Sequence, residues 1–168
     1  RDGRPHPMDR WSRRIGEKLA RHFEGRAVFP FDGPPYPPFL RWAGLSGTVE
    51  MSPISMYLHH KYGLWHAYRF ALEFDTSLVN SVQNLTDISV CERCEEQPCL
   101  DSCPVNAFAP GQYEVDDCVA YLAKNTQSDC RQQGCRARRS CPQARDHHYH
   151  PDHAQFHMNA FLQSQKKP

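Results

Sequence analysis

The stretch that decides this chain is residues 91–103, CERCEEQPCLDSC, which Pro104 follows and which spaces its cysteines as C-x2-C-x4-C-x3-C-P. A second run, DCRQQGCRARRSCP at residues 129–142, has the spacing C-x4-C-x5-C-P. Cys118 lies alone between the two runs, and together these positions hold all eight cysteines of the chain. Two closely spaced thiol runs that each end in Cys-Pro are typical of a chain that wraps two metal–sulfur centres.

The spacing predicts two 4Fe–4S clusters with crossed ligands. Short gaps let a loop place three thiolates around one centre, and the cysteine before proline serves the other cluster. Proline then fixes φ and removes a backbone donor at that point. We therefore expect the first cluster on Cys91, Cys94, Cys99 and Cys141, and the second on Cys103, Cys118, Cys130 and Cys135.

Two other uses of eight cysteines compete with this interpretation. A disulfide framework suits small secreted chains, whereas most of this chain has no cysteine to link and shows no signal peptide. A zinc site would use paired C-x2-C knuckles, but only one pair has that gap and the Cys-Pro endings are then unexplained. Iron–sulfur is the preferred interpretation, and zinc leaves an interaction module without redox chemistry as an alternative.

Composition sets broad limits on function. The 168 residues carry a formal net charge of +1, so no bulk field attracts nucleic acid or a membrane surface. No apolar run has the length of a membrane span, and the need for reduced thiols predicts a cytoplasmic location. The chain begins at Arg1 without methionine, and we expect a further piece of the same domain upstream.

The first half of the chain alternates between helical and extended patterns. Trp11, Ile15 and Leu19 recur at helical spacing and predict an amphipathic helix over 8–24. The remaining patterns predict a strand at 26–31, a proline-rich corner at 32–38, a helical turn at 39–43, a loop at 44–53, and strands at 54–58 and 64–74 joined by a hairpin connection at 60–63.

Helices are also predicted around and after the cysteines. Residues 115–122 carry Cys118 and begin with two aspartates, which suit a helix N-terminus. A last helix is expected from Pro151 or Asp152, with an apolar side that includes Phe156 and Leu162. Residues 75–90 read as a linker.

The cysteine segment resembles a known family. The order of its eight cysteines and the stretch Val115-Asp116-Asp117-Cys118-Val119-Ala120-Tyr121-Leu122 are similar to the two-cluster part of epoxyqueuosine reductases. The family's second motif is tighter, C-x2-C-x3-C-P, and its first motif places the third ligand two residues earlier. The chain also resembles bacterial iron–sulfur proteins described as ferredoxins.

A weaker resemblance lies upstream. Residues 58–69, LHHKYGLWHAYR, are similar to a hairpin shared by epoxyqueuosine reductases and cobalamin-trafficking chaperones, which have a flavin-reductase-like fold. The resemblance implies an acidic proton donor near Asp32 and a cobalamin or flavin held near Tyr36, Tyr62 and Trp65.

The predicted fold class is α+β. A partial flavin-reductase-like α/β layer over 1–85 precedes a two-cluster ferredoxin-like module over 86–145, and a His-rich segment with a C-terminal helix covers 146–168. The leading function is electron transfer with a redox partner protein. The alternative is an oxidoreductase acting on a small-molecule substrate, whose clusters feed a corrinoid or flavin.

Charged and histidine-rich stretches admit further hypotheses. The histidines between His147 and His157 are expected to form a solvated, partly aromatic-packed surface rather than a metal site. Arginines interleaved with the second cysteine run are expected to offset cluster charge, and RNA binding is the less favoured use: Arg131, Arg136, Arg138, Arg139. Acidic residues border the first run and should make the first cluster the more reducing one: Glu92, Glu95, Glu96, Asp101.

Overall fold

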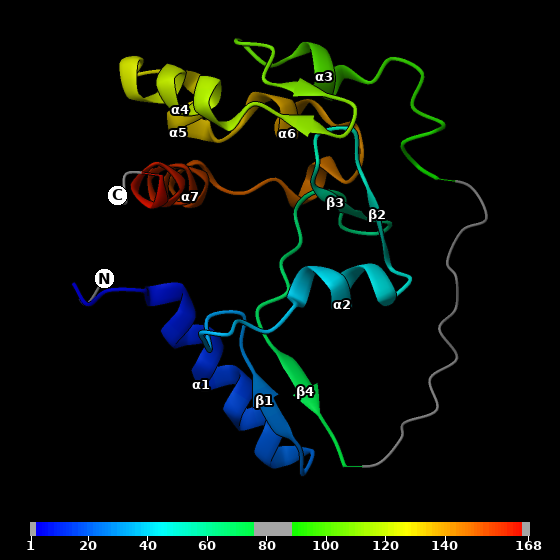
Figure 1. The fold of residues 1–168 in the computed structure, drawn as a ribbon, viewed down its shortest axis with the longest axis vertical. Coiled ribbons are helices and arrows are strands. Elements are labelled where there is room, and N and C mark those ends of the chain that lie inside the picture. The colour runs from blue at the N-terminus through cyan, green and yellow to red at the C-terminus, as the bar shows by residue number, and fades with distance from the viewer. Residues whose placement is uncertain (1–2, 76–88, 166–168) are drawn as a thin grey trace. The chain divides into compact units, whose positions relative to one another are not determined.

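The computed structural model describes residues 3–75 and 89–165 and combines helices with small antiparallel sheets, which confirms the α+β class (Figure 1). The chain divides into two compact units. One comprises Arg1–Gly47 and Ala67–Asn84, and the other Thr48–His66 and Leu85–Pro168. In the described part, every helix is too short or too polar to cross a bilayer.

The first unit is a helix packed beside a two-stranded sheet (Figure 1). Helix α1 (Pro7–His22) leads into β1 (Arg26–Val28), which pairs antiparallel with β4 (Ala71–Glu73), and α2 (Phe39–Leu45) follows the proline-rich corner. The predicted helix and first strand are confirmed, with the strand ending three residues earlier than expected.

The buried side of α1 is made of small residues. Ser12, Gly16 and Ala20 are buried, whereas Trp11 of the predicted apolar stripe is 47% exposed. The buried face of α1 is therefore shifted by one residue from the predicted one, because the helix makes its close contact not at Ile15 but at Gly16. A Cβ atom there would lie 2.9 Å from the ring of Phe29, which is almost fully buried.

The predicted hairpin around residues 60–63 is wrong. Strand β2 (Val49–Met51) lies in the expected loop and pairs with β3 (Tyr57–His59), while the chain after the turn returns only as a single bridge between His59 and Gly63. Of the predicted strand at 64–74 only β4 forms. Leu64 and Trp65 are both buried, which a half-buried strand does not allow for neighbours.

Short helices make up most of the second unit. They are α3 (Pro98–Asp101), α4 (Val115–Lys124), α5 (Asp129–Gln133), α6 (Arg136–Ser140) and α7 (Pro151–Ser164), with a 3-10 turn at Arg145–His147. An unpredicted hairpin, β5 (Phe108–Ala109) with β6 (Gln112–Tyr113), precedes α4. The predicted helices at 115–122 and from 151 are confirmed.

Cysteines form part of the core of the second unit. Ile54, Leu58 and Leu64 pack with Cys99, Cys103, Cys141 and two alanines in one buried cluster. A second cluster joins Leu122 of α4, Cys130 of α5 and Leu162 of α7. Four of the eight cysteines are therefore buried, and the other four are partly exposed.

Candidate metal centre

The first predicted set of cysteines lines one cavity. Cys91, Cys94, Cys99 and Cys141 all face a space of about 260 Å³, although Cys141 follows Cys99 by more than forty residues. Helices α3 and α6 pack together and bring them near each other. The Ser140 hydroxyl donates to the carbonyl of Pro98 at 3.0 Å, so the residue before Cys141 is tied to the residue before Cys99.

The second predicted set lines another cavity. Cys103 after α3, Cys118 on α4, Cys130 on α5 and Cys135 at the start of α6 all face it. Its own free space is small, about 20 Å³, and Cys118 and Cys135 also border a larger neighbouring cavity. The Ala107 N–H donates to the Cys103 sulfur at 3.3 Å.

Burial raises the pKa values of three thiols of the first set, Cys91, Cys99 and Cys141. Burial, then the adjacent Glu50 carboxylate, raises the pKa of Cys91 to about 12, and burial is also the first cause of the raised pKa values of Cys99 and Cys141. The neighbouring thiols that add to these pKa shifts belong to the same set. Metal binding here would have to release protons.

Three thiols of the second set, Cys118, Cys130 and Cys135, follow the same pattern. Burial raises the pKa of Cys135 to about 11 and also raises the pKa values of Cys118 and Cys130. Backbone N–H groups oppose this rise at Cys130 and Cys135 by hydrogen bonding to their sulfurs. Donors of this kind stabilise thiolate charge, as the sulfur ligands of an iron–sulfur cluster require.

None of the eight thiols, all of which lie in the described part of the chain, forms a disulfide. Within residues 3–75 and 89–165, no group of three or more His, Cys, Asp or Glu has a geometry that could hold a metal ion. A single zinc ion needs four sulfurs about 3.8 Å apart, given Zn–S bonds of about 2.3 Å in a tetrahedron.

Two residues that contact the thiols were not predicted from the sequence. The Glu50 carboxylate accepts the Cys91 N–H at 3.0 Å, and the Tyr113 side chain hydrogen bonds to the Cys118 thiol. Glu50 lies on β2, 41 residues before Cys91, so no local pattern links the two. Tyr113 is five residues before Cys118. An aromatic residue this close to a predicted ligand is the one feature of the sequence that could have indicated the contact.

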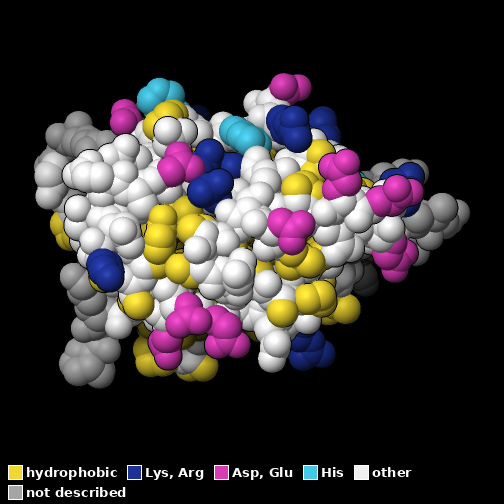
Figure 2. All heavy atoms as spheres, turned by 90° about the horizontal axis from the view of Figure 1, so that it is seen from above, with side chains coloured by type: hydrophobic (Ala, Val, Ile, Leu, Met, Phe, Trp, Pro, Cys, Tyr) yellow, Lys and Arg dark blue, Asp and Glu magenta, His cyan; other side chains and the backbone are white. Residues whose placement is uncertain are grey.

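The arginines of the second run are held by intramolecular bonds. Arg131 donates to Asn159 at 2.9 Å, Arg138 to the Leu64 carbonyl, and Arg139 to Asp129. Figure 2 shows one face of the molecule, on which acidic and basic side chains are interspersed. The four acidic residues that border the first run are exposed: Glu92, Glu95, Glu96, Asp101.

Asp32 and Tyr36 belong to the first unit. Arg13 donates to the Asp32 carboxylate, and the same carboxylate accepts the Phe29 N–H at 3.3 Å. The Arg13 guanidinium also lies 4.6 Å from the centre of the Phe29 ring. Asp32 thus closes a corner of the chain, and Tyr36 is 65% exposed.

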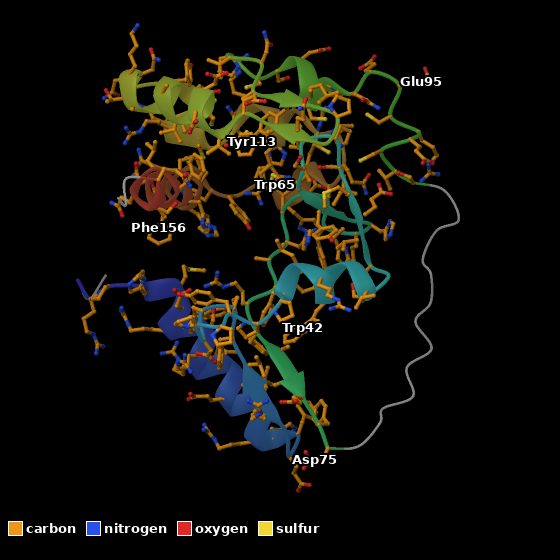
Figure 3. The ribbon with its side chains drawn as sticks, viewed as in Figure 1. Trp42, Trp65, Asp75, Glu95, Tyr113 and Phe156 are labelled. Atoms are coloured by element: carbon orange, nitrogen blue, oxygen red, sulfur yellow. The ribbon has the colours of Figure 1, made fainter. Side chains whose placement is uncertain are left out.

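Tyr62 and Trp65 belong to the second unit, where Figure 3 shows Trp65 and Tyr113. Tyr62 contacts the rings of His59 and His147, at 4.8 and 5.2 Å between centres. Trp65 packs against His148, at 4.4 Å, and Arg138. Tyr62 and Trp65 therefore help to anchor the His-rich segment.

The His-rich segment is packed through its rings. Tyr149 stacks on His153 at 4.2 Å, and the Nε2 atoms of His153 and His157 are 2.9 Å apart on one side of α7. This agrees with the expectation of an aromatic-packed surface.

No family model, curated protein or solved structure matches the chain.

Proposed function

We propose that this chain carries two 4Fe–4S clusters and transfers electrons. The observation that carries the proposal is the division of eight free thiols into two groups of four, each lining its own cavity. These two groups are the ligand sets predicted for crossed ligation, in which Cys103 and Cys141 each bind the cluster of the other run. One-electron storage is the chemistry that such clusters supply when bound.

The donor set fits a cluster better than a single ion. The four thiolates of a cubane bind four different iron corners and lie farther apart than those of tetrahedral zinc. Hydrogen bonds to the sulfur atoms, such as Ala107 N–H to Cys103, further suit a cluster.

Anaerobic purification with iron and sulfide quantitation tests the proposal. We expect about eight iron and about eight sulfide per chain, since each cubane holds about four of each, and a brown protein. About four of each would indicate a single cluster. A colourless protein with stoichiometric zinc would overturn the proposal in favour of an interaction module.

A reductase is the second candidate, because a cavity suited to a small molecule adjoins Cys118 and Cys135. In this version the protein is an oxidoreductase similar to epoxyqueuosine reductases and works in the cytoplasm with a redox partner protein. Corrinoid or flavin that stays bound through gentle purification would favour it. The Arg13 and Phe29 contacts give Asp32 a structural use that competes with a proton-donor role.

A further inference from the structure

Two histidines lie one helical turn apart on α7. His153 and His157 are four positions apart in sequence, so their side chains project from the same side of the helix. Their Nε2 atoms are 2.9 Å apart. Both side chains are half-buried, and neither belongs to the buried core. The helix thus presents two imidazole nitrogens side by side.

The distance between the two nitrogens suits a shared metal ion. Imidazole nitrogens bind such ions at about 2.0–2.1 Å, so two of them at a right angle are about 2.8–3.0 Å apart. A tetrahedral angle would place them about 3.3–3.4 Å apart. The observed 2.9 Å therefore matches the right angle, which neighbouring ligands make in square-planar and octahedral complexes.

The orientation of the two rings agrees with this arrangement. Their centres are 4.6 Å apart, whereas their Nε2 atoms are 2.9 Å apart, so both Nε2 atoms point toward the gap between the rings. Without metal, one neutral ring donates its Nε2 proton to the other. A metal ion would take the place of this proton, and both rings would remain neutral with their protons on Nδ1.

Aromatic neighbours hold the histidine pair in place. Tyr149 stacks on the His153 ring at 4.2 Å, and the Phe156 ring, labelled on α7 in Figure 3, contacts His157 edge-on at 5.6 Å. The stacking of Tyr149 uses the face of the His153 ring, whereas a metal ion uses a lone pair in the ring plane, so the two contacts are compatible. Rings that are already ordered lose less side-chain freedom on binding.

We propose that His153 and His157 together bind one divalent transition-metal ion, nickel(II) or copper(II), with water in its remaining positions. The right angle favours these ions over zinc, which prefers a tetrahedron. With two protein ligands, the site differs from the groups of three or more that the described residues lack. It goes beyond electron transfer, does not depend on the clusters, and departs from the sequence-based expectation that these histidines serve packing alone.

The test measures nickel binding to the anaerobically purified chain without an affinity tag. Ni²⁺ is the probe, because Cu²⁺ oxidises thiols. Bound nickel is measured by equilibrium dialysis, with iron content determined on the same samples. The variants are His153→Gln, His157→Gln and both together. The matched control is His22→Gln on α1, where Lys18 and Arg26 stand in place of a second histidine one turn away.

We expect one nickel ion per chain whose affinity falls by at least about tenfold in either single variant, the smallest loss typical of a disturbed metal site. Because both nitrogens bind the same ion, the double variant should lose little more than either single one. The control variant should bind nickel as the unmodified chain does.

Additive losses in the double variant would show two separate weak sites and overturn the proposal. Unchanged nickel binding in the variants, or Zn²⁺ bound more tightly than Ni²⁺, would also overturn it. The difference between the unmodified chain and the variants excludes any nickel held by thiols. Since the iron content reports the clusters, failure of this site is distinguishable from their absence.

Discussion

Cys141 is the residue that decides whether the ligands cross between the two centres. It follows Cys135 by six residues in sequence, yet it lines the cavity of Cys91, Cys94 and Cys99. Cys141→Ser should therefore lower the iron content from about eight to about four per chain. The lost electron paramagnetic resonance signal should be the one that Cys91→Ser also removes.

The matched comparison is Cys130→Ser, which should remove the other signal, as should Cys103→Ser. The exposed Thr126→Ser serves as the control with unchanged iron. If Cys141→Ser instead removes the signal that Cys130→Ser removes, each motif holds its own cluster and the crossed arrangement is wrong.

Asp32 shows how one carboxylate fixes a corner of the chain. Its oxygens accept from Arg13 and from the Phe29 N–H, beside a ring that is almost fully buried. Asp32→Asn keeps the shape and removes the charge. Because the pair is partly exposed to solvent, we expect a loss of about 1 kcal/mol or less in the free energy of unfolding.

Chemical denaturation followed by circular dichroism measures this change in stability. Glu17→Gln, at an exposed position on α1, is the control with no change. A purely catalytic Asp32 would leave the denaturation midpoint where it is and alter only turnover, once a substrate is known.

Helix α1 depends on the absence of a side chain at Gly16. Alanine is normally the better helix former by about 1 kcal/mol. Here its Cβ would lie 2.9 Å from the Phe29 ring and 3.1 Å from Phe70, closer than packed atoms allow. Gly16→Ala should therefore destabilise the protein by about 1–3 kcal/mol, the usual cost of overpacking.

The outcome of Gly16→Ala is read from the urea midpoint. Arg14→Ala on the exposed side of the same helix should leave it unchanged or raise it slightly. A gain in stability from Gly16→Ala would mean that the helix does not pack on Phe29 as closely as described.

The turn after β3 should make stability depend on pH. His59 Nδ1 accepts the backbone N–H groups of Lys61 and Tyr62, at 3.0 and 3.3 Å, which requires a neutral ring. Burial, then nearby His66, lowers the pKa of His59 below 6.5, and burial is also the first cause of the lowered pKa of His66. The unfolded chain therefore takes up these protons first as the pH falls.

The histidine contribution is fully present above pH 6.5, the unfolded value, and is lost as the pH falls through the lowered pKa. We expect the urea denaturation midpoint, measured at several pH values from about 7.5 to about 5.5, to decrease as the pH drops below 6.5. His59→Asn keeps an acceptor oxygen but no longer titrates, so its profile should be flatter. Parallel profiles for both proteins would show that His59 does not contribute to the pH dependence.

Elements with a strong local pattern could be predicted from the sequence, and elements set by distant contacts could not. Helices α1, α4 and α7 follow from the spacing of their apolar residues. Alternation at 64–74 was misleading, because Leu64 and Trp65 are both buried and Arg69 bonds to Asp9 and Ser12 of α1. These contacts join residues some sixty positions apart.

The gathering of the cysteines at two cavities could be anticipated from their spacing in two short runs, whereas the clusters that they would bind stay a prediction. Their partners Glu50 and Tyr113 were not anticipated, because a single acidic or aromatic residue has no distinctive pattern. The same holds for Asp32, whose ion pair with Arg13 depends on how α1 packs beside β1.

At the scale of the whole molecule, a net charge of +1 conceals an uneven distribution around the two cysteine sets. Carboxylates lie at the first set, where Glu50 contacts Cys91 and three exposed glutamates follow close by in sequence. Arginines lie at the second set, although Asp129 pairs with Arg139 and offsets part of their charge. Negative charge near a cluster disfavours an added electron and lowers the reduction potential.

The first centre should therefore have the lower midpoint potential in a titration monitored by electron paramagnetic resonance, with the signals assigned through the cysteine variants. Replacing Glu92, Glu95 and Glu96 together by glutamine should raise that potential and leave the second centre unchanged. The change should shrink as salt is added, because these carboxylates are exposed and screened by ions. If the first centre has the higher potential, or if both potentials move together, surface charge does not separate the two centres. Hydrogen bonds to the sulfurs would then be the property that distinguishes them.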